Sequence, residues 1–486
     1  MTSEDHPAGR SWVPRALGAV SGLMLAAGAL LPALAPLQAI ALGPILYVAA
    51  SPKVSKRLAV TAGFYMGVFY TLPQLVVVQM HPLIAVVLLV DLALVMTLFA
   101  AGAMLLLRRW PLLGAAGAGA LLAALDWLNF TLVPPWGIAQ SLARPWSAYP
   151  RLVAFVSITG LTGVLFVVTC IQAWAVVAAI DPRRRLRAVV AAAAVLVVAA
   201  GANLAARTGE PTGTITVAAV GWLWNEKPGI SPNDRPDGHK GFKALYAGPV
   251  AEAAAKGAKL VVSPEMGFRS IRGPRDLWLH QFRQVARKNG VFLVFGYLDV
   301  PDNANRLVFM GPDGKVLRTY TKTHLTPSER TRPGTGEVAV TDILGHRVGG
   351  MICHDDNYTD FTRAHGRRKV ALMAVPTFDW PAVKSAHFQS SVGRAIESRY
   401  AIVRAARNGI SAIISPHGEV LARRDHYTDG PGAIVAEVRL RPMRTVFSIA
   451  GHWPAMAGAV FVAACFAVMI VQALRSGRRG PDEMPA

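Results

Sequence analysis

The chain has 486 residues, of which 53% are apolar and only 16% are charged, and its formal net charge is +21. Soluble proteins carry roughly 25% charged residues, so this composition excludes an ordinary soluble enzyme and a disordered chain. The three cysteines are too few for a disulfide scaffold. A membrane protein remains, with its charges concentrated outside the apolar segments.

Eight apolar runs approach the length that a helix needs to cross the hydrocarbon core of a bilayer, about 20 residues. They lie at 16–34, 36–50, 58–79, 83–107, 112–133, 152–180, 188–206 and 450–474. The second run is short, so a tilted or re-entrant segment is an alternative for it. The first run lacks a clear cleavage site and further apolar runs follow it, so we expect a retained helix and not a signal peptide.

These runs divide the chain into four parts. We expect an N-terminal bundle of about seven spans in residues 1–206, a polar domain at 207–446, a C-terminal span at 447–474 and a tail at 475–486.

Basic residues cluster in every second loop between the runs, whereas the opposite short loops contain only Arg144 and Arg151. Because Lys and Arg collect in cytoplasmic loops, both termini are predicted to be cytoplasmic and residues 207–446 extracytoplasmic. The clustered residues are Arg10, Arg15, Lys53, Lys56, Arg57, Arg108, Arg109, Arg183, Arg184, Arg185, Arg187, Arg475, Arg478 and Arg479.

The polar stretch 207–446 has the pattern of one α/β domain. Short β-branched runs bounded by Gly, Pro, Asn or Asp predict strands, and runs with a helical period predict helices between them. The predicted strands are 214–220, 259–262, 291–297, 306–310, 348–353, 370–374, 410–415 and 433–438. The predicted helices are 242–256, 275–289 and 384–407. The mixture is typical of a layered fold in which helices cover sheets.

Residues 212–446 contain 33 basic and 21 acidic residues, a surplus that cytoplasmic loops do not explain. It indicates either a surface that faces anionic lipid headgroups or a merely solvated basic surface. We expect no nucleic-acid partner for a domain outside the cytoplasm. Trp222 and Trp224 could insert into lipid as interface anchors, or they could simply pack.

Cys353 is the only cysteine of the polar domain and therefore has no disulfide partner there. It follows the apolar run 348–352, which predicts a thiol at the carboxyl end of a strand, where α/β folds bind ligands. A buried structural thiol is the alternative interpretation. Cys170 and Cys465 lie in apolar runs and are interpreted as membrane residues.

Two charged residues also follow predicted strand segments, Glu265 after 259–262 and Lys322 after a strand edge at Tyr320. Each alone is more typical of a solvated surface charge. Together with Cys353 they supply what acyl transfer through sulfur requires. Glu265 can take the thiol proton, the sulfur can attack a carbonyl, and Lys322 can stabilise the thiolate and the developing oxyanion.

The order Glu, Lys and Cys, each at a strand end of an α/β domain, resembles the nitrilase superfamily. The eight apolar runs and several matching segments narrow the resemblance to the apolipoprotein N-acyltransferases. The matching segments are Asp126-Trp127, Pro135-Trp136, LVVSPE ending at Glu265, YTKTHLTP around Lys322, MICHDD around Cys353, FDW ending at Trp380, residues 406–420, and GHWPA before the last run.

The resemblance implies a fold of about eight transmembrane helices with a nitrilase-like αββα sandwich inserted before the last helix. It implies that Glu265 is the general base, that Cys353 is the nucleophile and that Lys322 stabilises the tetrahedral intermediate. Cys353 would take an acyl chain from a membrane phospholipid as a thioester. The α-amino group of the N-terminal diacylglyceryl-cysteine of an apolipoprotein would accept it.

We also expect a monomer in the bacterial inner membrane, with its catalytic domain on the periplasmic side, and no cofactor. The seven histidines between 324 and 426 form no HxxxH or HExxH pair, so we expect no metal site.

The chain departs from the family pattern around the nucleophile. Asp355 stands where the family commonly has a glutamate two residues after the cysteine, and Glu329 comes one residue early for a further family glutamate. His324 flanks the site and could tune it, and Trp380 follows Asp379 where the family has an Asn-Asp-x-Trp segment. Asn129 replaces an arginine often found in the fifth span. We expect Glu329, Asp355, His324 and Trp380 to support the site.

Two alternatives stay open. One is a membrane-anchored nitrilase-like amidase, in which water resolves the thioester. The other is a catalytically silent paralogue that acts as a binding or scaffold protein. The intact set of Glu265, Lys322 and Cys353 disfavours the second alternative, and the altered neighbours of Cys353 favour it.

Overall fold

The computed structural model describes residues 11–78, 81–133, 136–223, 242–270 and 277–478. Its internal contacts divide the chain into two compact units. The membrane unit comprises residues 1–132, 161–201 and 452–486, and the α/β unit comprises residues 133–160 and 202–451.

The membrane unit consists of helices that match the predicted apolar runs. Eight stretches among the described residues are long and apolar enough to cross a membrane, which confirms the predicted number and a multi-pass membrane protein. They are α1 (Trp12–Leu30), a stretch of η2 (Pro32–Leu37), α2 (Gln38–Ala41) and α3 (Gly43–Ala50), then α4 (Lys56–Val78), α5 (Pro82–Arg109), α6 (Pro111–Leu132), α8 (Thr162–Ile180), η5 (Pro182–Arg184) with α9 (Arg185–Arg207), and α16 (Trp453–Arg478).

Small residues let the membrane helices approach closely, as is common where no hydrophobic effect drives helices together. A Cβ atom at Gly18 of α1 would lie 2.1 Å from the Ala62 carbonyl oxygen of α4, and one at Gly67 of α4 would lie 2.5 Å from the Ala93 Cα of α5. Helix α9 differs, because Ala188 is its only buried residue. Its apolar surface is therefore suited to contact lipid.

The sixth predicted span is wrong at its beginning, because α8 starts at Thr162 and not near 152. The residues before it form the short helix α7 (Val156–Thr159), which ends at Gly160 with φ +71°. Val153 and Val156 are buried within the α/β unit. The predicted run 152–180 therefore contains a buried segment of the α/β unit as well as a membrane helix. Hydropathy alone does not distinguish residues of a protein core from residues that contact lipid.

The α/β unit contains two sheets, each with parallel and antiparallel pairs. The first has the order β13-β1-β2-β4-β5-β6, and β3 also pairs with β4. Its strands are β1 (Gly213–Gly221), β2 (Leu260–Val262), β3 (Arg269–Ser270), β4 (Phe292–Asp299), β5 (Ala304–Met310), β6 (Val316–Thr321) and β13 (Gly432–Leu440). The second has the order β12-β11-β10-β9-β8-β7. Its strands are β7 (Ala339–Ile343), β8 (His346–Gly350), β9 (Leu372–Phe378), β10 (Ala401–Arg407), β11 (Ile410–Ile414) and β12 (Val420–Asp425).

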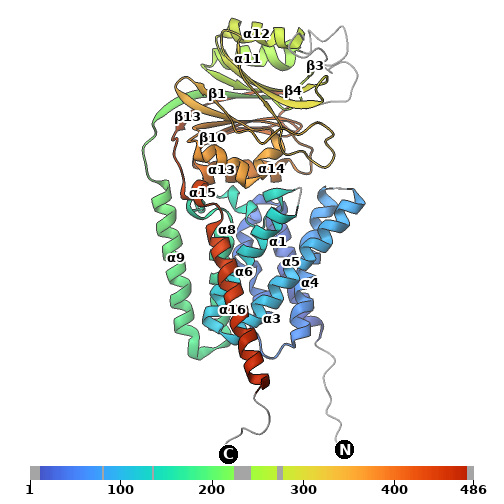
Figure 1. Cartoon of the computed structure of the whole chain (residues 1–486), viewed down its shortest axis with the longest axis vertical. Coiled ribbons are helices and arrows are strands. Elements are labelled where there is room, and N and C mark those ends of the chain that lie inside the picture. The colour runs from blue at the N-terminus through green and yellow to red at the C-terminus, as the bar shows by residue number, and fades with distance from the viewer. Residues whose placement is uncertain (1–10, 79–80, 134–135, 224–241, 271–276, 479–486) are drawn as a thin grey trace, which may run out of the picture. The chain divides into compact units, whose positions relative to one another are not determined.

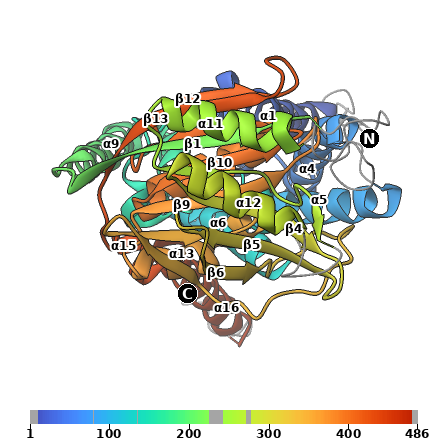
Figure 2. The ribbon, with the colours of Figure 1, turned by 90° about the horizontal axis from the view of Figure 1, so that it is seen from above.

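Helices cover the outer face of each sheet, which gives the predicted α/β sandwich its four layers (Figure 1). Helices α11 (Gly248–Ala255) and α12 (Leu277–Asn289) lie side by side over the first sheet (Figure 2). Helices α13 (Thr359–Arg367) and α14 (Lys384–Ser398) cover the second sheet.

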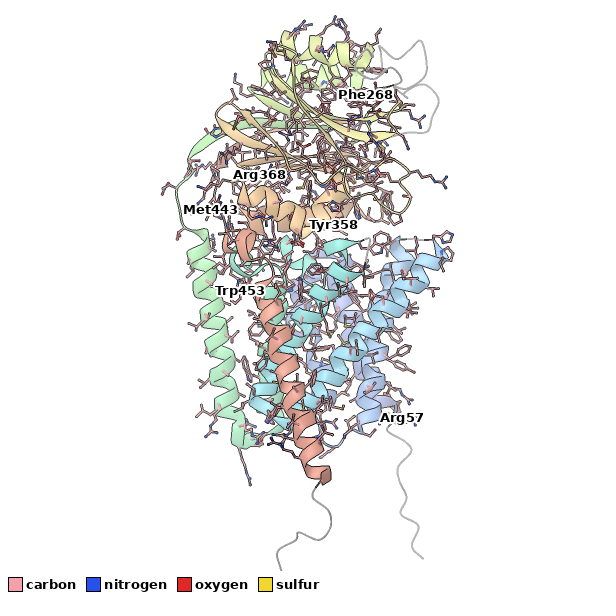
Figure 3. The ribbon with its side chains drawn as sticks, viewed as in Figure 1. Arg57, Phe268, Tyr358, Arg368, Met443 and Trp453 are labelled. Atoms are coloured by element: carbon pink, nitrogen blue, oxygen red, sulfur yellow. The ribbon has the colours of Figure 1, made fainter. Side chains whose placement is uncertain are left out.

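Alternate side chains of β5 pack into the two hydrophobic cores on either side of the first sheet. Val308 and Met310 join the core beneath α11 and α12, which also contains Phe268 (Figure 3). Leu307 and Phe309 point the other way, against β8. A Cβ at Gly350 would lie 2.5 Å from the Phe309 ring, so glycine is what allows the two sheets to approach here.

The predicted helix 384–407 is wrong in its second half. Helix α14 ends at Ser398, Arg399 takes a left-handed φ of +56°, and residues 401–407 form β10. Every residue of β10 is buried, because the strand lies in the middle of the second sheet with other layers on both faces. A strand buried on both faces has no polar–apolar alternation to distinguish it from a buried helix.

The interpretation of Trp222 as an interface anchor that inserts into lipid is also wrong, and the alternative that it simply packs is confirmed. Trp222 is 1% exposed and packs edge-on against Tyr246, with ring centroids 4.8 Å apart. Trp224 lies outside the described residues.

Candidate active site

Glu265 lies three residues beyond the carboxyl end of β2 and is 2% exposed. The turn that carries it packs on β4, where a Cβ at Gly296 would be 2.8 Å from the Glu265 Cα. The next residue, Met266, has a left-handed φ of +46°, which is unusual for a residue with a Cβ. The glycine and the strained turn together place the carboxylate inside the unit.

Lys322 directly follows β6, and its ammonium group pairs with two carboxylates. Its Nζ lies 2.8 Å from Glu265 Oε1 and 2.7 Å from Glu329 Oε2. The Lys322 side chain is 2% exposed, so neither ion pair is screened by water. Glu329 therefore lies in the same cluster, although it comes one residue before the position at which the family has a glutamate.

Asn305 of β5 was not predicted, and it connects the two glutamates. Its Nδ2 donates to Glu265 Oε1 at 2.7 Å and to Glu329 Oε1 at 2.9 Å. Glu265 Oε2, by contrast, is buried and has no hydrogen-bond partner among the described residues. One oxygen of Glu265 is therefore held in place, and the other is available to take a proton.

Cys353 lies beyond the end of β8, at the first residue of the short helix η8 (Cys353–Asn357). The predicted strand 348–353 thus ends at Gly350. Cys353 is 5% exposed and has a left-handed φ of +48°, a strain of the kind found at functional sites. Its Sγ lies 3.5 Å from the Phe378 carbonyl oxygen at the end of β9.

The charges around the thiol act on it in opposite directions. Burial raises the pKa of Cys353 well above its usual value, Glu265 raises it further, and Lys322 lowers it. The pKa of Lys322 is lowered by burial but raised by Glu265, Cys353 and Glu329, and the net change is upward. The resting site therefore contains a neutral thiol and a charged lysine, so a reaction at sulfur requires a base.

Asp355 connects the nucleophile turn to the loop after Lys322. Its Oδ1 accepts from the His324 backbone N–H at 2.8 Å and lies 3.0 Å from His324 Nδ1. Its Oδ2 accepts from the Tyr320 hydroxyl at 2.8 Å and from the Ile352 N–H at 3.0 Å. Both oxygens of Asp355, which is shorter than the glutamate common in the family, therefore accept hydrogen bonds that hold the two loops together. The ring of His324 also stacks on Tyr358 at a centroid distance of 3.8 Å. Tyr358 lies just before α13 (Figure 3).

Replacement of Asp355 by asparagine is expected to destabilise the α/β unit by about 1–3 kcal/mol, because an amide NH₂ would face N–H and O–H donors. Any reaction at Cys353 should slow as the loop that carries Lys322 shifts. Thermal unfolding of the purified protein measures the first effect. The matched control is Asp342→Asn, since Asp342 is an exposed carboxylate of β7. Equal unfolding temperatures for the two variants would contradict the assigned role of Asp355.

Trp380 is not brought against the cluster. It is 43% exposed, one residue beyond the buried Asp379. Of the four residues expected to support the site, Glu329 bonds to Lys322 directly, and Asp355 bonds to Tyr320 and Ile352, which lie near Lys322 and Cys353 in the chain. His324 bonds to Asp355, and Trp380 lies at the surface.

A second buried group next to Cys353 was not predicted from the sequence. His387 of α14 lies between Asp356 and Asp379, and Asp379 also pairs with Arg404 of β10 at 2.8 Å. Cys353, Asp379 and His387 place one ligand atom each within 4.8 Å of one another, a set that could hold a metal ion. However, both ring nitrogens of His387 already contact carboxylates, so we interpret the group as a network of charges.

Arg407, at the end of β10, was also missed. Its guanidinium lies 3.8 Å from the centroid of the Phe378 ring, and its Nη1 donates to the Met266 carbonyl oxygen at 2.9 Å. It therefore links the turn that carries Glu265 to the strand end whose carbonyl contacts Cys353. No local signal distinguished Arg407 or His387 from surface charges. Asp379 lies beyond the predicted strand 370–374 and directly after the observed β9, so only its place in the FDW segment pointed to it.

The α/β unit matches a known family of enzymes. The carbon-nitrogen hydrolase family model matches residues 227–446, which include Glu265, Lys322 and Cys353. Among solved structures, an amidase from Nesterenkonia sp. is similar, with 21% identity, a TM-score of 0.40, and coverage of 48% of this chain and 92% of that one.

Two relatives match half of the chain or more. An apolipoprotein N-acyltransferase from Ralstonia nicotianae is 28% identical over 401 residues, which are 74% of this chain and 72% of that protein. One from Gloeobacter violaceus is 28% identical over 274 residues. That alignment covers 50% of this chain and spans about half the length of the relative, 51%.

A third relative matches a smaller part of the chain. The omega-amidase NIT2 of Danio rerio is 28% identical over 211 residues, which are 36% of this chain and 75% of that protein.

Proposed function

We propose that this chain, which belongs to the nitrilase superfamily through its carbon-nitrogen hydrolase domain, is an acyltransferase that moves an acyl chain from a membrane phospholipid to the N-terminus of a lipoprotein. The observation that carries the proposal is the buried cluster of Glu265, Lys322 and Cys353 in a chain with eight candidate membrane spans. A soluble amide substrate would need no such membrane unit, whereas both proposed substrates are lipids.

In the first half-reaction, Glu265 Oε2 takes the proton of the Cys353 thiol while the sulfur attacks the ester carbonyl of the phospholipid. The free Oε2 suits this role because Oε1 is occupied by Asn305 and Lys322. The tetrahedral intermediate collapses when the lysophospholipid oxygen leaves with the proton from Glu265. A thioester on Cys353 remains.

Lys322 is proposed to stabilise the oxyanion of the intermediate. An ammonium group has three N–H donors, and the two glutamates accept two of them. The third remains for the developing negative charge, in a buried site where such a hydrogen bond is strong. Glu329 and Asn305 hold Lys322 and Glu265 in register, which reduces the reorganisation needed during the reaction.

In the second half-reaction, the α-amino group of a diacylglyceryl-cysteine attacks the thioester. Glu265 accepts a proton from the amine and returns it to the leaving sulfur, so an amide forms and the thiol is restored. The burial of Cys353 supports this order, because a thioester shielded from water survives until the amine arrives.

We propose that the α/β unit faces the periplasm of a bacterial cell and that the chain acts as a monomer in the inner membrane. Two features support the periplasmic location of the α/β unit. The two segments of the α/β unit follow the fifth and the seventh candidate spans, which places both on the same side, and the basic loops alternate as the positive-inside rule requires.

The test is to incubate the purified full-length protein with a phospholipid that carries a labelled acyl chain. We expect label on the protein, located by mass spectrometry on the peptide that contains Cys353 and released by neutral hydroxylamine. Addition of a synthetic diacylglyceryl-cysteinyl peptide should then discharge the label onto its amino group. Absence of a labelled thioester would sink the proposal.

An amidase-like function is the second candidate, and the match to the omega-amidase favours it. Water would then resolve the thioester in place of an amine. The same experiment separates the two functions, because a thioester that turns over rapidly to free fatty acid without the peptide acceptor would identify a hydrolase.

A further inference from the structure

His387 lies between two carboxylates in the interior of the α/β unit. Its Nδ1 is 2.7 Å from Asp379 Oδ1, and its Nε2 is 2.9 Å from Asp356 Oδ1. A carboxylate can only accept a hydrogen bond, so each ring nitrogen must donate one. Both nitrogens therefore carry a hydrogen, and the geometry requires a positively charged imidazolium.

The carboxylates use their other oxygens within the same network. Asp379 Oδ2 accepts from Arg404 Nη2 at 2.8 Å, and Asp356 Oδ2 accepts from the Ser391 hydroxyl at 2.6 Å. Arg404 Nε in turn donates to the Ser391 oxygen at 3.2 Å. Two cations and two anions thus balance, and the buried network is neutral only while His387 is charged.

The network adjoins the nucleophile. Asp356 lies in the same short helix as Cys353, and His387 Nε2 is 3.3 Å from the Cys353 carbonyl oxygen. The sulfur of Cys353 lies within 4.8 Å of a nitrogen of His387 and an oxygen of Asp379. At this distance in a buried site, one uncompensated charge has a large effect on the thiolate.

We propose that His387 is a positioning residue that stays protonated, holds the turn from Cys353 to Asp356 in its strained conformation, and cancels the negative charge of Asp356 and Asp379 beside the sulfur. The inference rests on the proposed role of Cys353 as the nucleophile.

The charged groups that face the ring are Asp356 of η8, Asp379 after β9 and, through Asp379, Arg404 of β10. Burial lowers the pKa of His387, but Asp356 and Asp379 raise it, and the net result is a pKa of about 9. His387 is therefore a cation at neutral pH. The negative charge of Asp379 raises the pKa of the Cys353 thiol, which is the effect that a charged His387 opposes.

The test measures the thiol itself and needs no substrate. In full-length protein whose Cys170 and Cys465 are replaced by alanine, Cys353 is the one remaining thiol. Its rate of alkylation by iodoacetamide is compared at fixed pH between 6 and 8, where His387 is charged in the parent. The thiolate is the species that reacts, so below the pKa of Cys353 the rate reports that pKa. The variants are His387→Gln, Asp356→Asn, and the two combined. The matched control is His280→Gln, since His280 is exposed on α12.

His387→Gln should slow alkylation about tenfold or more at a fixed pH in this range, because removal of the imidazolium raises the pKa of the thiol. The double variant restores neutrality with Arg404 and Asp379 alone, so its rate should return close to that of the parent. His280→Gln should change nothing.

An unchanged rate in His387→Gln, or a double variant as slow as the single one, would overturn the proposal. If His387→Gln does not unfold cooperatively, Asp356→Asn decides alone. It leaves an excess positive charge, so alkylation must be faster than in the parent, and an unchanged or slower rate refutes the inference. Because alkylation reports on the thiol, loss of the proposed acyl-transfer function would not alter the outcome.

Discussion

Replacement of Cys353 by alanine is expected to reduce acyl transfer by at least about 10³-fold, as removal of a covalent nucleophile does in other enzymes. The thioester cannot form without the sulfur, and no second thiol is available to replace it, because Cys170 and Cys465 lie in helices of the membrane unit. Transfer of a labelled acyl chain from phospholipid to a diacylglyceryl-cysteinyl peptide measures the loss.

Cys170→Ala and Cys465→Ala are the matched controls, since each removes one buried thiol outside the candidate site. Both should retain most of the activity. Cys353→Ala should unfold close to the parent protein, because the hydrogen bond that its Sγ makes to the Phe378 carbonyl oxygen, at 3.5 Å, is from a weak S–H donor. Activity in Cys353→Ala above a tenth of the parent rate would rule out covalent catalysis at this residue.

Replacement of Lys322 by methionine is expected to have the second largest effect, on stability as well as on activity. It leaves the carboxylates of Glu265 and Glu329 buried together, with the Asn305 amide as their remaining shared donor. Removal of one partner of a buried ion pair typically costs about 3–5 kcal/mol. Loss of the oxyanion donor should reduce acyl transfer about 10²–10³-fold.

The destabilisation should diminish as the pH is lowered, because protonation of one glutamate removes the repulsion between the two. Thermal unfolding between pH 4 and pH 8 measures this trend. The double variant Lys322→Met/Glu329→Gln should recover part of the stability and none of the activity. Lys315→Met is the matched control, because the Lys315 side chain is 81% exposed. Equal unfolding temperatures of Lys322→Met and Lys315→Met at neutral pH would contradict the burial of the cluster of Lys322, Glu265 and Glu329.

The membrane helices were predictable because their signal is local. A run of about 20 apolar residues has few alternatives to a membrane span, so the number of candidate spans was confirmed. The exception has a physical reason. Residues 152–160 are as apolar as a membrane helix but pack inside the α/β unit, and hydropathy is the same for both environments.

The second sheet was harder to predict than the first. Strand β10 is buried along its whole length and follows α14 after only two residues, Arg399 and Tyr400. Its assignment as a strand depends on pairing with β9 and β11, which are distant in sequence or follow it. The left-handed turn at Arg399 is stabilised by hydrogen bonds from its guanidinium to the Pro416 and Ala154 carbonyl oxygens, which a local pattern cannot contain.

The sequence by itself determined the class of this protein and the residues of the proposed reaction. Composition required a membrane, and Glu265, Lys322 and Cys353 were identifiable because each follows a strand segment. Only the tertiary structure decided how these groups are charged and held. The pairing of Lys322 with two glutamates, the bridge made by Asn305, and the enclosure of His387 by two aspartates all join residues from separate strands and helices. Such contacts depend on the packing of two sheets and their helices, and burial then makes each charge matter far more than its position in the sequence indicates.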